Sequence, residues 1–207
     1  MAGMDLYLAS GNAHKAQEFQ ALVSGSSARV RERVRVLSAR EAGGMPPVCE
    51  DSGTFEGNAA KKALALLPRL PAGAWALSDD SGLCVDALGG HPGVESAYYA
   101  GPQGDSAANL RKLVEVMRPV GPGHRGAHFV CVLCLAGPDG AVRHFEGRCI
   151  GALRPEPAGG AGFGYDPLFV PEGHDRTFAE LGEAAKNAIS HRSRAWLKLA
   201  EWLEGNA

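Results

Sequence analysis

One tight turn between two apolar segments constrains the fold more than any other feature of the chain. Residues 127–136 and 142–150 flank the sequence Gly-Pro-Asp-Gly at 137–140, which is typical of the turn in a β-hairpin. The first half of the chain differs, because strand-like and helix-like apolar patterns alternate along it. This combination predicts an α/β protein with a mixed β-sheet flanked by helices.

Hydrophobic spacing and capping residues predict the other elements. Residues 4–9 form a short apolar strand, and the apolar positions after the Ser-Gly-Asn turn at 10–12 recur at a helical spacing. Residues 54–67 are rich in Ala and Leu, which predicts a helix that ends at Pro68. The other expected elements are strands at 75–78 and 83–85, a helix capped by Asp105 or Ser106, and a last helix after Ser190.

Arginines occupy every second position of residues 29–36, with valines or a glutamate between them. A period of two predicts a strand with one basic and one largely apolar face. Such a stripe serves either to bind phosphates or to keep an edge strand solvated and free of aggregation. We favour the second interpretation.

The size and charge of the chain limit the classes of function. With 207 residues the chain is expected to form one domain, 1–207, with a sizeable core. Its 21 Lys and Arg and 23 Asp and Glu give a formal net charge of −2. A dedicated nucleic-acid-binding protein is usually strongly basic, so no nucleic-acid partner is expected. A small anionic ligand held by a few local cations is compatible with this balance.

The cysteines and the apolar segments indicate a cytoplasmic protein. Cys131 and Cys134 form a C-x-x-C pair inside the apolar segment 127–136, where buried strand thiols fit better than a metal or redox site. Five cysteines without a signal peptide fit a reducing compartment. No segment has the roughly 18 consecutive apolar residues that a membrane span needs. We therefore expect a cytoplasmic location and no membrane partner.

The first candidate functional segment lies between the first strand and the first helix. Unpaired N–H groups and a partial positive charge at a helix N-terminus attract anions. Gly11 allows a close approach to the backbone, and Lys15 can reach back to a phosphate from one turn into the helix. The alternative is an ordinary capped helix with an exposed lysine. The residues of this segment are Ser10, Gly11, Asn12, Ala13, His14 and Lys15.

The second candidate is a pair of acidic dipeptides, Glu50-Asp51 and Asp79-Asp80. Carboxylates at strand ends suit Mg²⁺, which prefers oxygen ligands and usually retains waters. Neighbours along an extended strand point to opposite faces, so one of Asp79 and Asp80 is expected to face the site. The alternative is that both pairs are turn residues, since Asp before Ser-Gly is common in turns.

Two further candidates lie in the second half of the chain. Residues 162–167 (Gly-Phe-Gly-Tyr-Asp-Pro) combine rings that can stack on a nucleobase with a carboxylate that can accept base N–H protons, and rings buried in the core are the alternative. Lys186 and the Ser190-His191-Arg192 segment place cations at an expected helix start, where they oppose the helix dipole unless an anion compensates. Because these charges are unfavourable at a helix start without an anion, we favour a functional site. The alternative is a buried His191 whose hydrogen bonds are made within the protein.

Taken in order along the chain, these segments resemble the inosine triphosphate pyrophosphatase family, whose members remove deaminated purine nucleotides. The resemblance covers nearly the whole chain. Any one motif is common, whereas the ordered set is specific. The matching stretches are Ser10-Gly11-Asn12 with Lys15 and Glu18, Thr54-Phe55 with Asn58-Ala59, residues 79–83, residues 87–90 with Pro92-Gly93, residues 162–167, residues 177–180, and Lys186-Asn187 with residues 189–192.

The resemblance implies a hydrolase that converts ITP, dITP or XTP and water to a nucleoside monophosphate and pyrophosphate. It implies an elongated mixed sheet flanked by helices, with two lobes and a nucleotide cleft between them. A family member of this kind is expected to be a cytoplasmic, Mg²⁺-dependent homodimer.

The resemblance also implies a role for each matching residue. Asp80 corresponds to the general base, and Asp80 and Glu50 to the metal ligands, with Asp51 as the alternative to Glu50. The segment 10–15 would hold the triphosphate, and Ser81 would contact the substrate. The remaining nucleotide contacts would be Phe163, Gly164, Tyr165, Asp166, Lys186, His191 and Arg192, of which His191 and Arg192 are expected to face the purine 6-oxo group.

Three positions depart from the family pattern. The segment between the first acidic dipeptide and Thr54 is one residue shorter than usual, Gly57 replaces a usual glutamate, and Tyr98 replaces a usual arginine. None of these departures removes the residues that carry the chemistry. A pyrophosphatase for other modified nucleotides and a nucleotide-sensing module without catalysis are the alternative functions.

Overall fold

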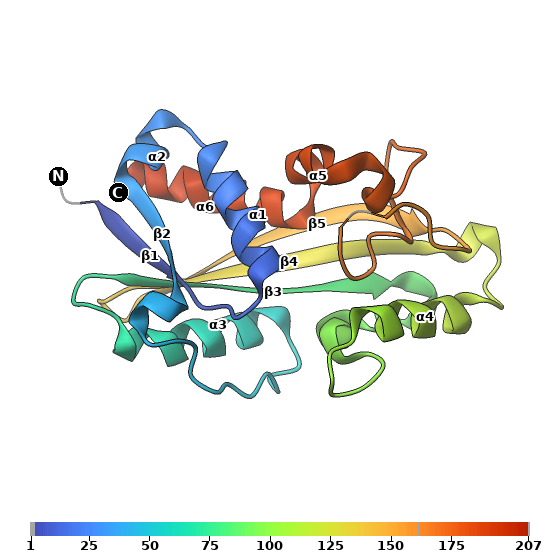
Figure 1. Ribbon diagram of the computed structural model, residues 1–207, viewed down its shortest axis with the longest axis horizontal. Helices are drawn as coiled ribbons and strands as arrows, with labels where there is room; N and C mark the ends of the chain where they lie inside the picture. Colours follow the sequence, from blue (N-terminus) through green and yellow to red (C-terminus); the bar gives the residue numbers. More distant parts are fainter. Residues whose placement is uncertain (1–2, 161, 207) are drawn as a thin grey trace. The chain divides into compact units, whose positions relative to one another are not determined.

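The computed structural model describes residues 3–160 and 162–206 (Figure 1). Its strands form a six-stranded sheet with the order β2-β1-β3-β4-β5-β6. Strand β1 pairs in parallel with both β2 and β3, whereas β6 is antiparallel to β5, so the predicted mixed sheet is confirmed. The strands are β1 (Met4–Leu8), β2 (Val34–Ser38), β3 (Trp75–Val85), β4 (Gly126–Ala136), β5 (Val142–Leu153) and β6 (Phe169–Pro171).

Helices connect the strands and follow the last of them. The α-helices are α1 (Ala13–Ser24), α2 (Ala28–Arg33), α3 (Phe55–Leu66), α4 (Ser106–Met117), α5 (Phe178–Ile189) and α6 (His191–Asn206). Short 3₁₀ helices lie at η1 (Ala39–Ala42), η2 (Leu67–Arg69), η3 (Asp86–Leu88), η4 (Gly93–Tyr98) and η5 (Pro122–His124). No helix of the described ranges is long and apolar enough to cross a membrane.

Capping residues explain why several elements begin where the sequence predicts. The Thr54 hydroxyl accepts a hydrogen bond from the backbone N–H of Gly57 and begins α3. The Asp105 carboxylate accepts from the N–H groups of Ala107 and Ala108 and begins α4. The predicted hairpin is confirmed as the neighbouring strands β4 and β5.

The prediction of a strand over residues 29–36 is wrong for residues 29–33 and confirmed for residues 34–36. The Ser27 hydroxyl accepts from the N–H of Val30 and begins α2, so the first arginines of this segment are helical. The strand starts only at Val34, and β2 lies at the edge of the sheet. Arg35 on β2 donates to both carboxylate oxygens of Asp5 on β1, at 2.7 and 2.8 Å. Its charge is therefore paired with a carboxylate on the neighbouring strand.

Two other predictions need correction. The segments 75–78 and 83–85 are not separate strands, because β3 runs without a break from Trp75 to Val85. The Asp-Asp-Ser-Gly sequence inside it is therefore not a turn.

Helix α5 and strand β6 were not expected. Helix α5 begins with a capping box in which Thr177 and Glu180 each accept from the other's backbone N–H, and Gly182 (φ +81°) interrupts its helical geometry.

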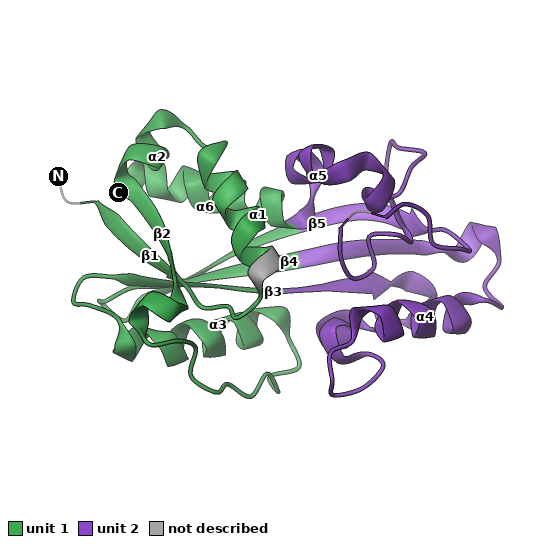
Figure 2. Cartoon of the chain, viewed as in Figure 1, with its two compact units in different colours: residues 1–80, 131–147, 192–207 green, residues 81–130, 148–191 purple. Residues whose placement is uncertain are grey.

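The chain divides into two compact units, neither of which is a continuous stretch of sequence (Figure 2). Unit 1 consists of residues 1–80, 131–147 and 192–207, and unit 2 of residues 81–130 and 148–191.

Within unit 1, helices α1 and α6 cover one face of the strands and α3 covers the other (Figure 1). The α1 and α6 side holds the larger apolar cluster, in which the rings of Phe19 and Trp196 meet edge to face at 6.0 Å. On the α3 side the Ser78 hydroxyl donates to the Ala59 carbonyl oxygen at 2.6 Å. Strand β3 therefore presents its two faces to two different helical layers. The α1 and α6 cluster includes Leu6, Leu8, Phe19, Leu77, Cys131, Leu133, Trp196, Leu199 and Leu203.

Unit 2 has its own core between α4 and α5. Arg125 is buried beside it, and its guanidinium donates to the carbonyl oxygens of Met117, Val120, Leu153 and Arg154. The bonds to Met117 and Val120 satisfy carbonyls at and just after the end of α4, and the four bonds together explain how a buried arginine is accommodated. The apolar side chains of this core include Leu83, Val85, Leu113, Met117, Phe129, Leu153, Tyr165, Phe169 and Phe178.

Candidate active site

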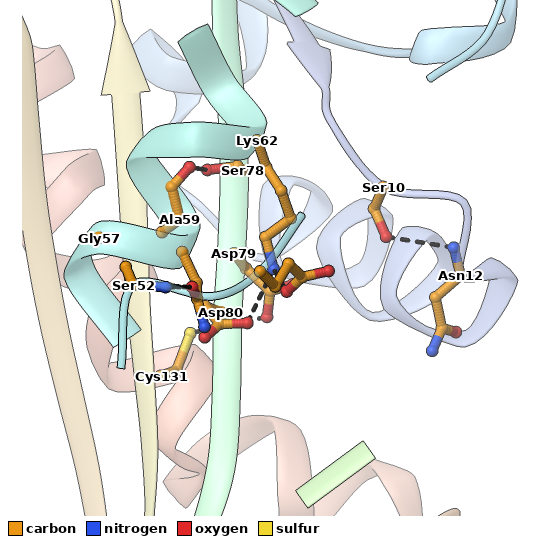
Figure 3. A network of polar contacts seen from close by, with 12 residues as sticks. Ser10, Asn12, Ser52, Gly57, Ala59, Lys62, Ser78, Asp79, Asp80 and Cys131 are labelled. Atoms are coloured by element: carbon orange, nitrogen blue, oxygen red, sulfur yellow. Dashed lines mark hydrogen bonds and ion pairs between the residues drawn. The ribbon is translucent and has the colours of Figure 1, made fainter. Parts of the chain in front are cut away.

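Two adjacent carboxylates on β3 face opposite sides of the sheet in unit 1. Asp79 points toward α1 and α6, whereas Asp80 points toward α3, as the alternation of side chains along a strand requires. The part of the candidate site that lies in unit 1 is built around these two groups (Figure 3). Both Asp79 and Asp80 are buried.

Asp79 is the centre of a buried ionic network. Lys15 Nζ on α1 lies 2.5 Å from Asp79 Oδ1, and Arg192 Nη2 on α6 lies 2.9 Å from Asp79 Oδ2. Arg192 also pairs through Nη1 with Glu18 on α1. Burial alone would raise the pKa of Asp79, but Lys15 and Arg192 outweigh burial and hold this pKa well below its usual range. Asp79 is therefore ionised at neutral pH.

Asp80 has a different environment on the other face of the strand. Lys62 Nζ on α3 lies 2.7 Å from Asp80 Oδ1 and 2.7 Å from Glu50 Oε2, so one ammonium holds two carboxylates. Asp80 Oδ2 is buried and has no hydrogen-bond partner among the described residues. Burial raises the pKa of Asp80 to about 6, although the charges of Lys62 and Lys15 act against it. Burial also disfavours the charge of Lys62, yet Asp80 and Glu50 leave the pKa of Lys62 above its usual value.

The environments of Asp79 and Asp80 shift the pKa values of these two neighbouring carboxyl groups in opposite directions. Asp79 is fixed in its charged form by two cations, whereas Asp80 has a pKa of about 6 and an oxygen without a hydrogen-bond partner in the described ranges. Such a divergence is typical of sites in which one acid organises the structure and the other exchanges a proton.

The loop before α3 separates Glu50 from Asp51. Asp51 pairs with the exposed Lys61, whereas Glu50 turns inward to Lys62. The loop is fixed by Asn58, which is buried and whose Oδ1 accepts from the backbone N–H of Ser52 at 3.1 Å and from its hydroxyl at 2.7 Å. This arrangement places Glu50, rather than Asp51, beside Asp80.

The same loop explains the glycine at position 57. A Cβ atom on Gly57 would lie 2.5 Å from Ser52 Oγ and 2.6 Å from Ser52 Cβ, so no side chain fits there while the loop keeps this shape. Gly57 and the loop that carries Ser52 are thus parts of one packing arrangement.

We expect Gly57→Ala to lower the free energy of unfolding by about 1–3 kcal/mol, the usual cost of overpacking. Helix propensity alone would predict a gain in stability, since alanine is favoured over glycine in helices. Urea denaturation of Gly57→Ala, Ser52→Gly and the double variant measures the coupling between the two positions. Ser52→Gly should abolish most of the cost. A stabilising effect of Gly57→Ala in the parent would contradict the packing argument.

The segment 10–15 forms the entry to α1. The Ser10 hydroxyl accepts from the N–H of Asn12 at 3.1 Å, and Asn12 Oδ1 accepts from the N–H of Lys15 at 3.3 Å. A Cβ atom on Gly11 would meet none of the described atoms within 4 Å. The backbone of residues 13–14 forms the first turn of α1, and the side chains of Ala13 and His14 lie outside the part of the chain that is described. Lys15 is held by Asp79 rather than exposed.

A second group of candidate residues lies in unit 2. Asp166 is buried, and its Oδ2 accepts from the N–H of Phe163 at 2.9 Å and from Lys186 Nζ at 2.8 Å. Lys186 Nζ also lies 4.5 Å from the centre of the Phe163 ring, which is partly exposed. Gly162 (φ +79°) is required here, because a Cβ atom would lie 2.4 Å from Asp166 Oδ2. The loop therefore presents one aromatic face beside a cation.

The other predicted residues take varied positions. The Tyr165 ring is in the core and its hydroxyl donates to the Ser96 carbonyl oxygen at 2.9 Å, as the core alternative predicts. Gly164 lies in the same loop with φ +63°. Ser81 lies on β3 and is half-buried. His191, the first residue of α6, is buried.

Lys186 and Arg192 were expected at the start of a helix, where an anionic ligand would have to compensate their charges. This expectation is wrong for Lys186, and Arg192 does not need a ligand for compensation. Lys186 lies in the last turn of α5, where a cation is favourable. Arg192 does lie in the first turn of α6, but Asp79 and Glu18 compensate its charge from within the protein.

Sequence reasoning missed Lys62, which holds Glu50 and Asp80 together. A signal for it exists in the helix pattern. Ala59, Ala63 and Leu66 form the fully buried stripe of α3, and Lys62 falls on that same stripe. A lysine on the apolar face of a helix needs a buried partner, and here it has two.

Comparison with known proteins identifies the family. The family model described as the Ham1 family matches residues 6–202. The chain belongs to the Ham1 family. A Ham1 protein of Staphylococcus aureus with a solved structure is 35% identical, with a TM-score of 0.83 over 98% of this chain and 100% of that chain.

Two relatives carry names that describe an activity. The dITP/XTP pyrophosphatase of Opitutus terrae is 59% identical over 199 residues, which cover 96% of this chain and 98% of that protein. The structure of the nucleoside-triphosphatase, or dITP/XTP pyrophosphatase, of Mycobacterium abscessus is 39% identical, with a TM-score of 0.74 over 95% of this chain and 98% of that chain. The family resemblance read from the motifs is confirmed, and the α/β fold is the fold of Ham1 proteins.

Proposed function

We propose that this chain hydrolyses deaminated purine nucleoside triphosphates, namely ITP, dITP and XTP, to the monophosphate and pyrophosphate. Its relatives from Opitutus terrae and Mycobacterium abscessus are named dITP/XTP pyrophosphatases. The observation that carries the proposal for this chain is the environment of Asp80. This carboxylate has a raised pKa and an oxygen with no hydrogen-bond partner in the part of the chain that is described, and it lies beside a second carboxylate and two lysines.

Asp80 is the general base of this proposal. Its Oδ2 is the atom that would orient the attacking water and accept its proton, while Oδ1 stays on Lys62. Its raised pKa makes Asp80 a stronger base than an exposed aspartate, and Lys62 keeps it ionised for the reaction. Asp79, held by Lys15 and Arg192, fixes the strand that carries it.

Glu50 and Asp80 fit a divalent cation. Among the described residues, no group of three or more His, Cys, Asp or Glu side chains is placed to hold a metal ion. The assignment of a metal site therefore rests on the pair Glu50 and Asp80. Mg²⁺ is usually bound by one or two carboxylates, with waters and substrate phosphates as the other ligands. Glu50 would hold the cation directly, and Asp80 would hold it through the water that its Oδ2 orients, an oxygen with no hydrogen-bond partner among the described residues. When bound, Mg²⁺ would neutralise charge on the triphosphate that repels a nucleophile.

Glu50→Gln should raise the Mg²⁺ concentration for half-maximal activity at least about tenfold. Loss of a residue that only supports a metal ligand already lowers metal affinity by about 10–100-fold, and Glu50 is proposed as a ligand itself. Asp51→Asn is the matched control, because Asp51 pairs outward with Lys61. Its half-maximal Mg²⁺ concentration should stay near that of the parent. Calorimetric titration of both variants with Mg²⁺ gives the same comparison without turnover. A shift in Asp51→Asn alone would move the assignment to Asp51.

The cations have a second role in this proposal. Lys15 and the N–H groups at the start of α1 would stabilise the charge that develops on the departing pyrophosphate. The partly exposed ring of Phe163, with Lys186 beside it, offers a stacking face for the purine. Ser81, Gly164 and the backbone of Ser10, Gly11 and Asn12 complete the proposed substrate contacts.

Selectivity would come from a donor that faces the purine 6-oxo group. A donor there is left unpaired by the 6-amino group of adenine, and such mismatches discriminate by about 10⁴–10⁵. Of the two candidates, Arg192 already donates through Nε, Nη1 and Nη2 to Asp79 and Glu18. We propose that His191 has this role. Guanine shares the 6-oxo group, so its rejection would need contacts near C2.

Pyrophosphate release from ITP, XTP, GTP and ATP, with and without Mg²⁺, tests the proposed function. ITP and XTP should be hydrolysed far faster than ATP, and only with Mg²⁺. A set of modified pyrimidine nucleotides in the same assay covers the alternative substrate class. Equal rates for all purines, or binding of ITP without release of pyrophosphate, would contradict the proposal. We further propose that the enzyme acts in the cytoplasm as a homodimer on free nucleotides, as the family resemblance implies.

A further inference from the structure

We propose that Phe129 is a positioning residue, which fixes the plane of the His191 imidazole and thereby contributes to the discrimination between 6-oxo and 6-amino purines. The inference rests on the proposed function, in which His191 faces the purine. Phe129 belongs to none of the motifs that carry the family resemblance. It lies inside the apolar strand β4.

The rings of Phe129 and His191 are stacked with nearly parallel planes within unit 2. The centre of the Phe129 ring lies 4.8 Å from that of His191, and the two planes differ by only 13°. Both residues are buried, with 7% and 4% of their surfaces exposed. An imidazole at the start of a helix thereby has a stacked ring from a β-strand against one of its faces.

Phe129 is itself fixed by two further rings. Phe169 meets it edge to face at 4.7 Å, and Phe178 stacks on it at 6.1 Å with an angle of 30°. Phe169 and Phe178 also contact each other, with their centres 5.2 Å apart. The ring that supports His191 is therefore part of a packed aromatic cluster, and it cannot turn without moving two neighbours.

A fixed plane matters because hydrogen bonds are directional. An N–H donor loses strength steeply as its angle to the acceptor departs from linearity. An imidazole that rotates about its Cβ–Cγ bond would adapt to either group, so the difference in binding free energy between 6-oxo and 6-amino purines would be smaller. A flat aromatic support removes that rotation, whereas an aliphatic side chain fills the space without defining a plane.

The test compares Phe129→Leu with Phe169→Leu. Both substitutions remove a buried ring from the same cluster, but only Phe129 stacks on His191. The quantity measured is the ratio of kcat/KM for ITP to kcat/KM for ATP. Because both values come from one preparation, the ratio does not depend on the fraction of folded protein. Phe129→Met is made alongside as a second non-aromatic variant that keeps more of the ring's length, and Phe129→Tyr restores the flat face.

We expect the ratio to fall about two- to tenfold in Phe129→Leu and Phe129→Met, the range set by the loss of one stacked ring pair. The fall should come from a higher KM for ITP with little change in kcat. The ratio should stay near the parent value in Phe169→Leu and Phe129→Tyr. An unchanged ratio in Phe129→Leu or Phe129→Met, or an equal fall in Phe169→Leu, would overturn the inference.

A spectroscopic readout separates this inference from the proposed function. Ring-current shifts of the His191 C–H resonances should be present in the parent and absent in Phe129→Leu, with His191→Asn used for assignment. A parent enzyme that shows no preference for ITP overturns the proposed function. A parent preference that Phe129→Leu retains overturns only the role of Phe129.

Discussion

Asp80→Asn should lower kcat for ITP by about 10²–10⁴-fold, the usual contribution of a general base, while the protein stays folded. The amide keeps the size of the side chain but cannot accept a proton from water. Lys62 keeps one carboxylate partner in this variant, because Glu50 Oε2 lies 2.7 Å from its Nζ. Circular dichroism should therefore be unchanged, and the loss should appear in pyrophosphate release under saturating ITP and Mg²⁺.

Asp51→Asn is the matched control for this experiment. It removes one carboxylate from the same loop as Glu50, but its partner is the exposed Lys61. Its kcat should equal that of the parent. An Asp80→Asn enzyme that turns over ITP at a rate near the parent's would show that the base lies elsewhere.

Asp79→Asn should have the largest effect on stability, a loss of about 3–5 kcal/mol in the free energy of unfolding. Asp79 is buried between Lys15 and Arg192, and neutralising it leaves two cations with less compensation in the interior. Urea denaturation at pH 7 measures the difference. Asp5→Asn is the control, because Asp5 pairs with Arg35 at the surface, and it should cost much less.

The same substitution predicts a dependence on pH. The pKa of Asp79 is lower in the folded chain than in the unfolded chain, so its ionisation stabilises the folded state above the unfolded pKa of about 3.9. The parent should lose this contribution as the pH falls below about 4, and the gap to Asp79→Asn should narrow. A gap that stays constant from pH 7 to pH 3 would contradict the ionic role of Asp79.

Local patterns predicted the elements whose causes are local. Helices α3 and α4 begin at Thr54 and Asp105, whose side chains cap them, and the hairpin follows from a Gly-Pro-Asp-Gly turn. The same method missed α5, because Gly182 interrupts the helical spacing, although Thr177 and Glu180 form a recognisable capping box. Residues 29–36 show the opposite error, since an alternating pattern coincided with a helix that Ser27 caps.

Elements whose causes are distant in sequence could not be predicted in this way. Asp79 and Asp80 resemble a turn because two adjacent charges are costly inside a strand. They are accommodated in β3 because Lys15 and Arg192 on one face and Lys62 on the other compensate them. Arg192 lies 113 positions from Asp79 in the sequence and meets it in the fold, and no local pattern contains that information.

The candidate site shows the same division. The sequence motifs pointed to Glu50, Asp80 and Lys15, and the structure of unit 1 brings these side chains close to one another. It was tertiary packing that revealed Lys62 as the link between the two carboxylates. The meeting of Asp80 with Lys186 around one substrate stays a prediction.

Hydrolysis of ITP in ¹⁸O-labelled water tests the central claim most directly. If Asp80 delivers water to the α-phosphorus while the cations stabilise a departing pyrophosphate, mass spectrometry will find the label in inosine monophosphate and none in pyrophosphate. Label in pyrophosphate, or release of orthophosphate and a nucleoside diphosphate, would contradict the account.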